Sequence, residues 1–333
     1  MNITYVLPLR WSDDADLTDL STYLGWLSAR AEVIVVDGSD PALFERHRDA
    51  WAGLRVQHIP PDPEFVCTMG KVAGVHTGLR RASQERVVIA DDDVRFDEIG
   101  LTAIAELLDR YDLVRPQNYF DALPWHARWD TARTLLARAV GRDWPGTLGI
   151  RRSTFWRMGG YDGDAMFENL ECLRTVRGAG GRIVSPLGLY VARRPPTTSL
   201  FLHQRIRQAY DELARPALLA LWLSLIPGTT YIVLKTGWKG AAALIGSAVA
   251  LAEVGRRRAG GTRVFPASTS LFAPLWLSER AVTAWIAVWF RMRRGGIPYR
   301  DSVVPHAATS QRELRRRQQR AGAARSEMSH SRR

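Results

Sequence analysis

Two hydrophobic periodicities alternate along the first third of the chain. Short apolar runs of the strand type occupy residues 3–9, 33–36, 55–59, 87–90 and 112–115. Apolar residues at helical spacing lie between them, at residues 17–27, 70–82 and 100–109. Because strands alternate with helices, the pattern predicts an α/β fold with a mostly parallel sheet covered by helices.

A long uncharged segment follows this region. Residues 216–234, PALLALWLSLIPGTTYIVL, contain no charged side chain and approach the length needed to cross a bilayer. Further apolar stretches at residues 240–251 and 265–290 are shorter or interrupted, with aromatic residues near their ends as in interfacial belts. We expect membrane association. The alternative is a soluble helical domain with one or two buried helices, and whether the later segments span, re-enter or lie in the interface stays open.

These patterns divide the 333 residues into three parts. Residues 1–215 form the α/β domain, residues 216–292 form transmembrane or interfacial helices, and residues 293–333 form a tail. The tail carries eleven arginines against three acidic residues, which accounts for most of the formal net charge of +12. The composition of residues 311–333 is typical of disorder.

A basic tail favours an anionic membrane surface or a nucleic acid as its partner. Since the tail has no interleaved aromatic residues, we predict no nucleic acid partner and keep a nucleic-acid arm as the weaker alternative.

Three features indicate the compartment. By the positive-inside rule, residues 256–258 and the tail face the cytoplasm. The opening MNITYVLPLR has a strand pattern that reaches Arg10 before any apolar signal segment, so we expect the first domain to stay in the cytoplasm. Cys67 and Cys172 form no CxxC motif, which indicates free thiols in a reducing compartment.

The candidate chemistry begins at the end of the fourth strand. Residues 87–96, VVIADDDVRF, are an apolar run that stops at Asp91, Asp92 and Asp93. The carboxyl ends of parallel strands face the crevice where open α/β sheets bind ligands, and two carboxylates one residue apart can hold a hard divalent cation. A polar turn is the alternative. Asp37 ends the second strand at the same edge, where its carboxylate can meet a nucleobase or cap a helix.

The order of these motifs resembles the nucleotide-sugar domain of family-2 glycosyltransferases, which have an inverting GT-A fold. The resemblance covers roughly residues 3–215 and is carried by Asp37-Gly38-Ser39, Gly70-Lys71, Asp91-Asp92-Asp93, Gly149-Ile150-Arg151-Arg152, Gly159-Gly160-Tyr161-Asp162, residues 167–181 and residues 203–208. Continuation into carboxyl-terminal membrane segments is similar to the ceramide-glucosyltransferase-like branch. The resemblance therefore implies a Rossmann-like GT-A domain followed by a helical, membrane-associated region.

The resemblance also implies roles for single residues. Asp91 and Asp93 would bind Mg²⁺ or Mn²⁺ that bridges the diphosphate of a nucleotide-diphosphate-sugar donor. The other residues assigned to the nucleotide sugar are Asp37, Lys71, Asp92, Gln204, Arg205 and Arg207, the last three from a degenerate Q-x-x-R-W motif. For the two arginines, a basic face next to the membrane is an equal alternative. For Lys71, the alternative is a solvated side chain at the start of a helix.

The catalytic base departs from the family pattern. That pattern places Glu-Asp on the helix of residues 167–181, with the aspartate removing the acceptor proton, whereas this chain has Glu168-Asn169. Because asparagine cannot act as a base, we assign the role to Glu168, with Glu171 on the same helical face as the second candidate. Asp162 and Asp164 are more remote candidates. The alternative is a catalytically inactive, membrane-anchored protein that binds nucleotide sugars as a scaffold.

Residues 115–130, RPQNYFDALPWHARWD, are interpreted as a long polar and aromatic loop. Trp125, His126 and Asp130 of this loop are assigned to the sugar or acceptor pocket, with filling of the core as the alternative. The membrane segment favours a lipid-linked or membrane-associated acceptor. The sequence therefore predicts a metal-dependent inverting glycosyltransferase of the cell membrane, with its catalytic domain and tail facing the cytoplasm.

Overall fold

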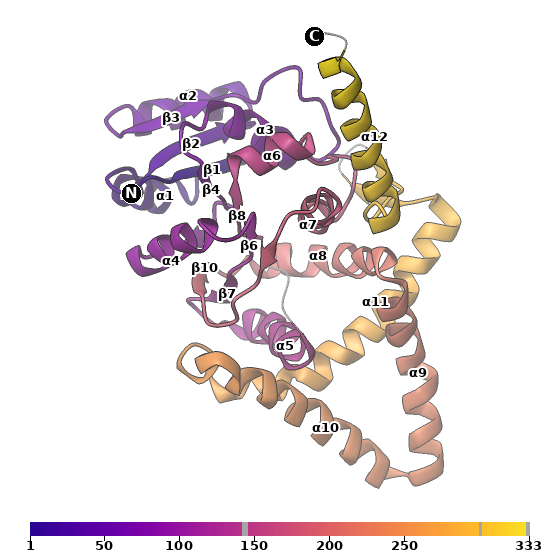
Figure 1. The fold of residues 1–333 in the computed structure, drawn as a ribbon. Coiled ribbons are helices and arrows are strands. Elements are labelled where there is room, and N and C mark those ends of the chain that lie inside the picture. Colours follow the sequence, from indigo (N-terminus) through magenta and orange to yellow (C-terminus); the bar gives the residue numbers. More distant parts are fainter. Residues whose placement is uncertain (142–145, 300–301, 331–333) are drawn as a thin grey trace. The chain divides into compact units, whose positions relative to one another are not determined.

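A computed structural model describes residues 1–141, 146–299 and 302–330 (Figure 1). The chain folds into two compact units that differ from the three consecutive parts expected. Unit 1 comprises Met1–Pro116, Pro145–Ser185 and Ala308–Arg333, and unit 2 comprises Gln117–Trp144 and Pro186–Ala307.

Unit 1 is built on a seven-stranded sheet of order β3-β2-β1-β4-β8-β6-β9. Its strands are β1 (Thr4–Leu9), β2 (Glu32–Asp37), β3 (Val56–Ile59), β4 (Arg86–Ile89), β6 (Leu113–Val114), β8 (Leu148–Arg151) and β9 (Ile183–Val184), and the short β5 (Val94–Arg95) follows β4. β8 pairs antiparallel with β4 and β6, whereas β1 pairs in parallel with β2 and β4, β2 with β3, and β6 with β9. The expected mostly parallel α/β sheet is confirmed.

The helices of unit 1 are α1 (Leu17–Ser28), α2 (Pro41–Trp51), α3 (Gly70–Arg81), α4 (Glu98–Leu108), α6 (Arg152–Met158), α7 (Glu168–Gly178) and α12 (Gln311–His330). α3 lies directly on β1 because two of its positions are glycine. A Cβ atom at Gly74 would lie only 2.8 Å from the Cβ of Pro8, and one at Gly78 would overlap the side chain of Val6. This close packing fixes the middle and the last turn of α3 against β1.

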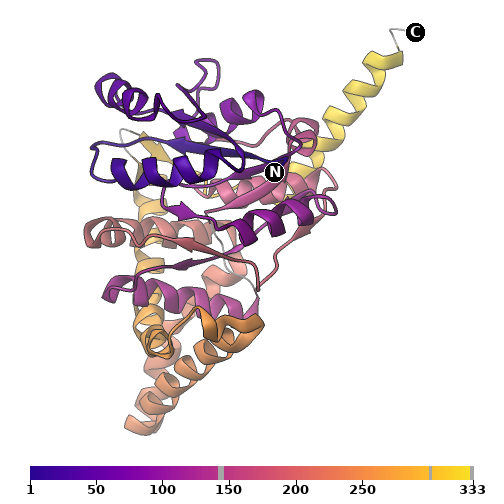
Figure 2. The same cartoon turned by 90° about the vertical axis from the view of Figure 1, so that its left-hand side faces the viewer.

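The tail expected to be disordered forms α12, which packs against α7. The side chain of Arg174 donates to the carbonyl of Thr309 at 2.8 Å, and Gln311 donates back to the carbonyl of Arg174 at 3.0 Å. Leu314 is buried, although few other residues of this segment are apolar. A few specific contacts with α7 thus order a segment whose composition alone favours disorder. In Figure 2 the outer end of α12 projects away from unit 1, and residues 331–333 lie outside the described residues.

Unit 2 is mainly helical. Its elements are β7 (Gln117–Phe120), α5 (Trp125–Val140), β10 (Tyr190–Arg193), α8 (Thr198–Tyr210), η1 (Asp211–Ala214), α9 (Pro216–Thr236), α10 (Trp238–Arg257), η2 (Arg258–Arg263), η3 (Ala267–Phe272), α11 (Ala273–Arg294), β11 (Ile297–Tyr299) and β12 (Ser302–Val304). β7 and β10 pair in parallel, and β11 and β12 pair antiparallel. The expectation of a long loop over residues 115–130 is wrong, because β7 and the first turns of α5 occupy it. Polar residues on the buried face of α5, such as His126 and Asp130, hide the helical period from a hydrophobicity pattern.

The core of unit 2 forms where α10 crosses α5. Ala248 and Ala252 of α10 are buried against Leu135 of α5, and a Cβ atom at Gly255 would overlap the carbonyl of Leu135. Arg138 of α5 is fully buried and donates to the carbonyls of Gly255 and Arg258 at 3.1 and 2.6 Å. Of residues 240–251, which the sequence left open as a membrane segment, Ala248 is therefore buried against α5, whereas Ile245 and Leu251 on the same helix are exposed.

α9 differs from the other helices of unit 2. It spans 21 residues with a mean hydropathy of 1.8 and buries none of them within the structure. In residues 1–141, 146–299 and 302–330 it is the one helix long and apolar enough to cross a membrane. Figure 1 shows it joined to α10 at their common end, next to Gly237.

Candidate active site

The two aspartate motifs leave the sheet at the same edge. β2 and β4 both run parallel to β1, with Asp37 opposite Leu9 and Ile89 opposite Val6. Trp11, just beyond β1, joins the motifs: its indole nitrogen donates to Asp92 and its backbone nitrogen donates to the Ser39 hydroxyl at 2.8 Å. The predicted common edge is therefore present, and it contains an aromatic residue that the sequence patterns did not single out.

Lys71 connects this edge with α7. Its Nζ lies 2.6 Å from Asp91 Oδ1 and 3.3 Å from Glu168 Oε1. Burial alone lowers the pKa of Lys71, but the charges of Asp91 and Glu168 outweigh burial and raise it, so the ammonium group stays protonated. Three residues that the sequence assigned to the site thus form one charged cluster.

Two hydrogen-bonded links bring Lys71 and Glu168 together, one to the Asp164 side chain and one between backbone groups. Thr68, before α3, donates from its backbone nitrogen and its hydroxyl to Asp164 Oδ1 at 2.8 and 2.7 Å. The backbone nitrogen of Met69 donates to the carbonyl of Gly163 at 2.9 Å. Because these links join the chain before α3 to the chain before α7, the first turns of both helices meet. Asp164, a remote candidate for the base, holds this junction.

The Gly-Gly motif before α7 has a backbone requirement. Gly159 and Gly160 have φ angles of +81° and +72°, in the left-handed region that favours glycine. A Cβ atom at Gly160 would also overlap the imidazole of His76 on α3, whereas one at Gly159 would meet no atom within 4 Å. The motif therefore lets the chain turn tightly against α3.

Gly160→Ala is expected to lower the free energy of unfolding by about 3 kcal/mol, since left-handed strain adds to the collision with His76. Gly159→Ala is the matched control. It has the strain without the collision, so we expect a loss of only about 1 kcal/mol. Urea titrations of both variants measure the difference, and equal losses would show that the contact with His76 is unimportant.

The two glutamates of α7 have different surroundings. Glu168 is 15% exposed at its side chain, and its Oε1 accepts from Asn169 Nδ2 at 3.2 Å as well as from Lys71. Glu171 is fully buried, its Oε2 accepts from the backbone nitrogen of Thr309 at 2.6 Å, and burial raises its pKa. Glu168 therefore lies beside the aspartate triplet, whereas Glu171 holds the segment that leads into α12.

The oxygens beside Lys71 fit a divalent cation. Asp91 and Asp93 supply carboxylates at the strand end, which are the ligands that Mg²⁺ and Mn²⁺ prefer. A Cβ atom at Gly146 would overlap Asp91 Oδ2, so glycine lets the backbone approach this carboxylate. The donors and the close backbone approach are compatible with the metal that the sequence predicts.

Asp37 is held by two histidines. It is 1% exposed, and its Oδ2 lies 2.6 Å from His47 Nδ1 and 3.0 Å from His58 Nε2, while Oδ1 accepts from the backbone nitrogen of Ser39 at 2.9 Å. Burial raises the pKa of Asp37, but the hydrogen bonds from His58, His47 and Ser39 outweigh it and lower the pKa to about 2. The three side chains offer metal-ligating atoms within 4.8 Å of one another, yet their short separations are those of hydrogen bonds. We interpret the group as a support that fixes Asp37.

The other six predicted site residues belong to unit 2. These are Trp125, His126 and Asp130 on α5, and Gln204, Arg205 and Arg207 on α8. Asp130 and Arg205 pair with each other at 3.1 Å, and both are buried. His126 Nε2 donates to the carbonyl of Pro196 at 2.8 Å, Gln204 is half-buried, and Trp125 is exposed. The structure thus pairs Asp130 with Arg205 inside unit 2 and gathers Lys71, Asp91 and Glu168 inside unit 1.

The Asp130 ion pair predicts a pH dependence of stability. Burial raises the pKa of Asp130, but Arg133 and Arg205 outweigh burial and lower the pKa to about 2, below the usual 3.8. The stabilisation is therefore complete above about pH 4 and is lost as the pH falls toward 2. We expect Asp130→Asn to unfold about 2 kcal/mol more easily than wild type at pH 6, with the gap narrowing at pH 3. Chemical unfolding at both pH values measures it, and a constant gap would contradict the ion pair.

No family model matches the chain, and no curated relative does. Among solved structures, the chain is similar to a mannosyltransferase from Pyrobaculum calidifontis in complex with GDP-Man and Mn²⁺, with 19% identity, a TM-score of 0.46, and coverage of 85% of this chain and 87% of that one. A mannosyl-3-phosphoglycerate synthase from Rubrobacter xylanophilus has 15% identity and a TM-score of 0.43, with 62% and 70% covered. A glucosyl-3-phosphoglycerate synthase from Mycobacterium tuberculosis in complex with Mn²⁺ and UDP has 20% identity and a TM-score of 0.43, with 62% and 77% covered. All three TM-scores lie below 0.5.

Proposed function

We propose that this protein is a metal-dependent glycosyltransferase of the inverting, family-2 type, which uses a nucleotide-diphosphate-sugar donor. The observation that carries the proposal is the Asp91–Lys71–Glu168 cluster at the carboxyl edge of the sheet. The cluster places a permanent positive charge and a carboxylate beside two candidate metal ligands. Departure of a nucleoside diphosphate needs positive charge, and deprotonation of an acceptor hydroxyl needs a base.

The aspartate edge is proposed as the donor site. Asp91 and Asp93 would hold Mg²⁺ or Mn²⁺, which neutralises the leaving diphosphate when bound. Lys71 adds a fixed ammonium group next to Asp91. Trp11 joins both aspartate motifs and is half-buried, so its indole is suited to pack against the nucleoside, with Asp92 and Asp37 fixed around it.

Glu168 is proposed as the base. Asn169 and Lys71 both donate to its Oε1, which fixes the carboxylate, and Oε2 would take the proton of the acceptor hydroxyl. Asn169 stands where the family pattern has the catalytic aspartate. Here its amide would orient Glu168, and Glu168 would act as the base. A single base acting opposite the leaving group gives inversion.

A membrane-associated or lipid-linked acceptor is proposed from unit 2. α9 is apolar and unburied, and Tyr231, Trp238, Trp285 and Trp289 are each about half exposed or more. Exposed aromatic residues on an apolar helical surface are typical of membrane interfaces. Location at the cell membrane, with the site facing the cytoplasm, and the ceramide-glucosyltransferase-like branch follow from the sequence patterns and are part of this proposal.

A donor screen tests the function. UDP-, GDP- and dTDP-sugars are added to the full chain in uncharged detergent with Mn²⁺, and unfolding temperature and release of nucleoside diphosphate are measured. A donor present at a hundred times its dissociation constant stabilises the protein by about 2.7 kcal/mol. We expect one donor class to bind and turn over, with both effects removed by EDTA.

The same screen distinguishes the glycosyltransferase from the second candidate function, a scaffold that binds nucleotide sugars without transferring them. Asn169 in the usual base position favours an inactive nucleotide-sugar-binding scaffold. Metal-dependent binding without turnover in the presence of membrane lipid extracts would support the scaffold. Absence of binding for every donor would reject both functions.

A further inference from the structure

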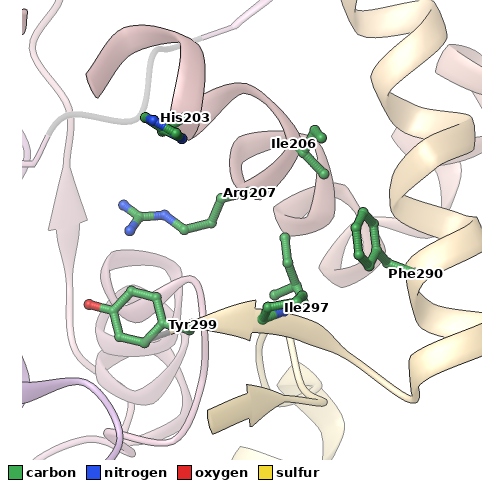
Figure 3. A pocket seen from close by; sticks show the side chains of 7 residues that line it. His203, Ile206, Arg207, Phe290, Ile297 and Tyr299 are labelled. Carbon is green, nitrogen blue, oxygen red and sulfur yellow. The ribbon is translucent and has the colours of Figure 1, made fainter. Parts of the chain in front are cut away.

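Unit 2 contains a pocket of about 330 Å³ at the carboxyl end of α11. α8, the last turns of α11 and β11 form it, and Figure 3 shows the side chains that line it. They are His203, Ile206, Arg207, Phe290, Ile297, Pro298 and Tyr299. Its volume is within the range of small-ligand sites, and its lining is part basic and part apolar.

The basic side of the pocket comes from α8. His203 and Arg207 lie one helical turn apart on α8, on the same face. The guanidinium of Arg207 lies 5.7 Å from the centre of the Tyr299 ring, and neither basic side chain forms an ion pair or hydrogen bond within the described parts of the chain. Arg205, two residues away, is paired with Asp130 and with Glu279 at 3.6 Å. Arg207 is therefore available to an anion, whereas Arg205 is not.

The apolar side defines the rest of the ligand. Ile206, Phe290 and Ile297 form the wall opposite the guanidinium (Figure 3). A small inorganic anion would leave this wall in contact with water. A phosphate ester with an apolar portion covers both sides, because a guanidinium matches phosphate geometry and the aliphatic wall gains from burial.

The surface next to the pocket indicates where such a ligand comes from. Trp289 and Met292 on either side of Phe290 are 49% and 79% exposed. Arg291, Arg293 and Arg294 follow in the last turn of the same helix, and all three are exposed. Exposed tryptophan beside clustered arginine is the pattern of a segment that lies at an anionic membrane surface.

We propose that this pocket binds the phosphate headgroup of an anionic membrane phospholipid, with Arg207 and His203 on the phosphate and Phe290 and Ile297 on the first carbons of the lipid. The occupant is a lipid of the bilayer itself. The site would orient unit 2 on the membrane whether or not the protein transfers sugar.

Short-chain lipids test the proposal on the full chain in uncharged detergent. Binding of dihexanoyl phosphatidylglycerol is measured by isothermal titration for wild type, Arg207→Gln and Arg263→Gln. Arg263 is an exposed arginine of η2 in the same unit, so both variants lose the same charge. We expect Arg207→Gln to weaken binding about tenfold or more and Arg263→Gln to change it less than about twofold, because of these two arginines only Arg207 lines the pocket that would hold the phosphate.

Two further titrations separate the possible ligands. Glycerol phosphate, which has the headgroup without the chains, is expected to bind wild type about tenfold more weakly, and Phe290→Ala should weaken binding of the lipid but not of glycerol phosphate.

Other outcomes would contradict the proposal. Equal losses of lipid affinity in Arg207→Gln and Arg263→Gln would overturn it in favour of diffuse electrostatic attraction. Glycerol phosphate as tight as the lipid would indicate a soluble phosphate ester. Loss of UDP affinity with lipid affinity retained in Arg207→Gln would return this arginine to the nucleotide. None of these outcomes depends on turnover, so they are distinct from failure of the glycosyltransferase proposal.

Discussion

Asp93→Ala is expected to reduce sugar transfer by about a thousandfold and to remove the stabilisation that donor and Mn²⁺ give together. The change removes one of the two carboxylates that would hold the cation at the end of β4, while Asp91 remains paired with Lys71. Without the cation, the charge of the leaving diphosphate is balanced by Lys71 alone. The measurements are the initial rate of nucleoside diphosphate release and the thermal shift with donor and Mn²⁺.

Asp49→Ala provides the matched control for this prediction. Asp49 is an exposed aspartate of α2 in the same unit, so its replacement changes the net charge equally and leaves the sheet edge intact. Its rate is expected to stay within about twofold of wild type. If Asp93→Ala keeps a metal-dependent rate close to that of Asp49→Ala, the cation is held elsewhere and the proposed donor site is wrong.

Much of unit 1 could be predicted because its physics is local. Runs such as residues 33–36 and 87–90 are short and apolar, as is typical of a buried parallel strand. The first lies within β2, and the second extends one residue beyond the end of β4. Since parallel strands end at one edge, the common position of Asp37 and the aspartate triplet followed from the strand pattern alone. The contact of Lys71 with Asp91 and Glu168 depends on the meeting of α3 and α7, which only the motif order suggested.

Other features depend on contacts between distant segments. His58 reaches Asp37 because β3 lies beside β2, and His47 reaches it from α2. Neither histidine has a local signal that distinguishes it from a core or surface residue. Residues 311–330 have the composition of a disordered tail, yet hydrogen bonds to Arg174 and burial of Leu314 accompany a helix there. Composition describes what a segment can form alone, whereas these features arise from what a second segment offers.

The division into two units has the same origin. The expected boundary at residue 215 follows the change from mixed to apolar composition, but the chain enters unit 2 already at Gln117 and returns to unit 1 twice. α5 contributes Leu135 to the unit 2 core and Arg138 to the carboxyl end of α10, so it belongs with helices more than a hundred residues later. A polar, aromatic segment was therefore interpreted as a loop, although it begins the helix on which the later helices pack.

Glu168→Gln is expected to lower the rate of transfer by a factor of about 10²–10⁴ while donor affinity stays within about threefold of wild type. Glutamine keeps the shape of the side chain and can still accept from Lys71 and Asn169 through its carbonyl oxygen, but it cannot remove a proton. The measurements are the rate at saturating donor and acceptor, the donor dissociation constant, and the rate against pH. Loss of the acid limb of that pH profile is the signature of a missing base, which a purely structural effect does not produce.

Glu171→Gln is the control that decides between the two glutamates of α7. The residues are three positions apart on one helix, but Glu171 is buried and accepts from the backbone of Thr309. We therefore expect Glu171→Gln to keep the rate within about threefold and to lower stability by about 1 kcal/mol, because a neutral amide accepts this hydrogen bond less strongly. The opposite outcome, with turnover kept in Glu168→Gln and lost in Glu171→Gln, would place the base under the segment that leads into α12. Because Glu171 is buried, the segment at Thr309 would then have to move away during the reaction to expose it. A base at Glu168 needs no such movement.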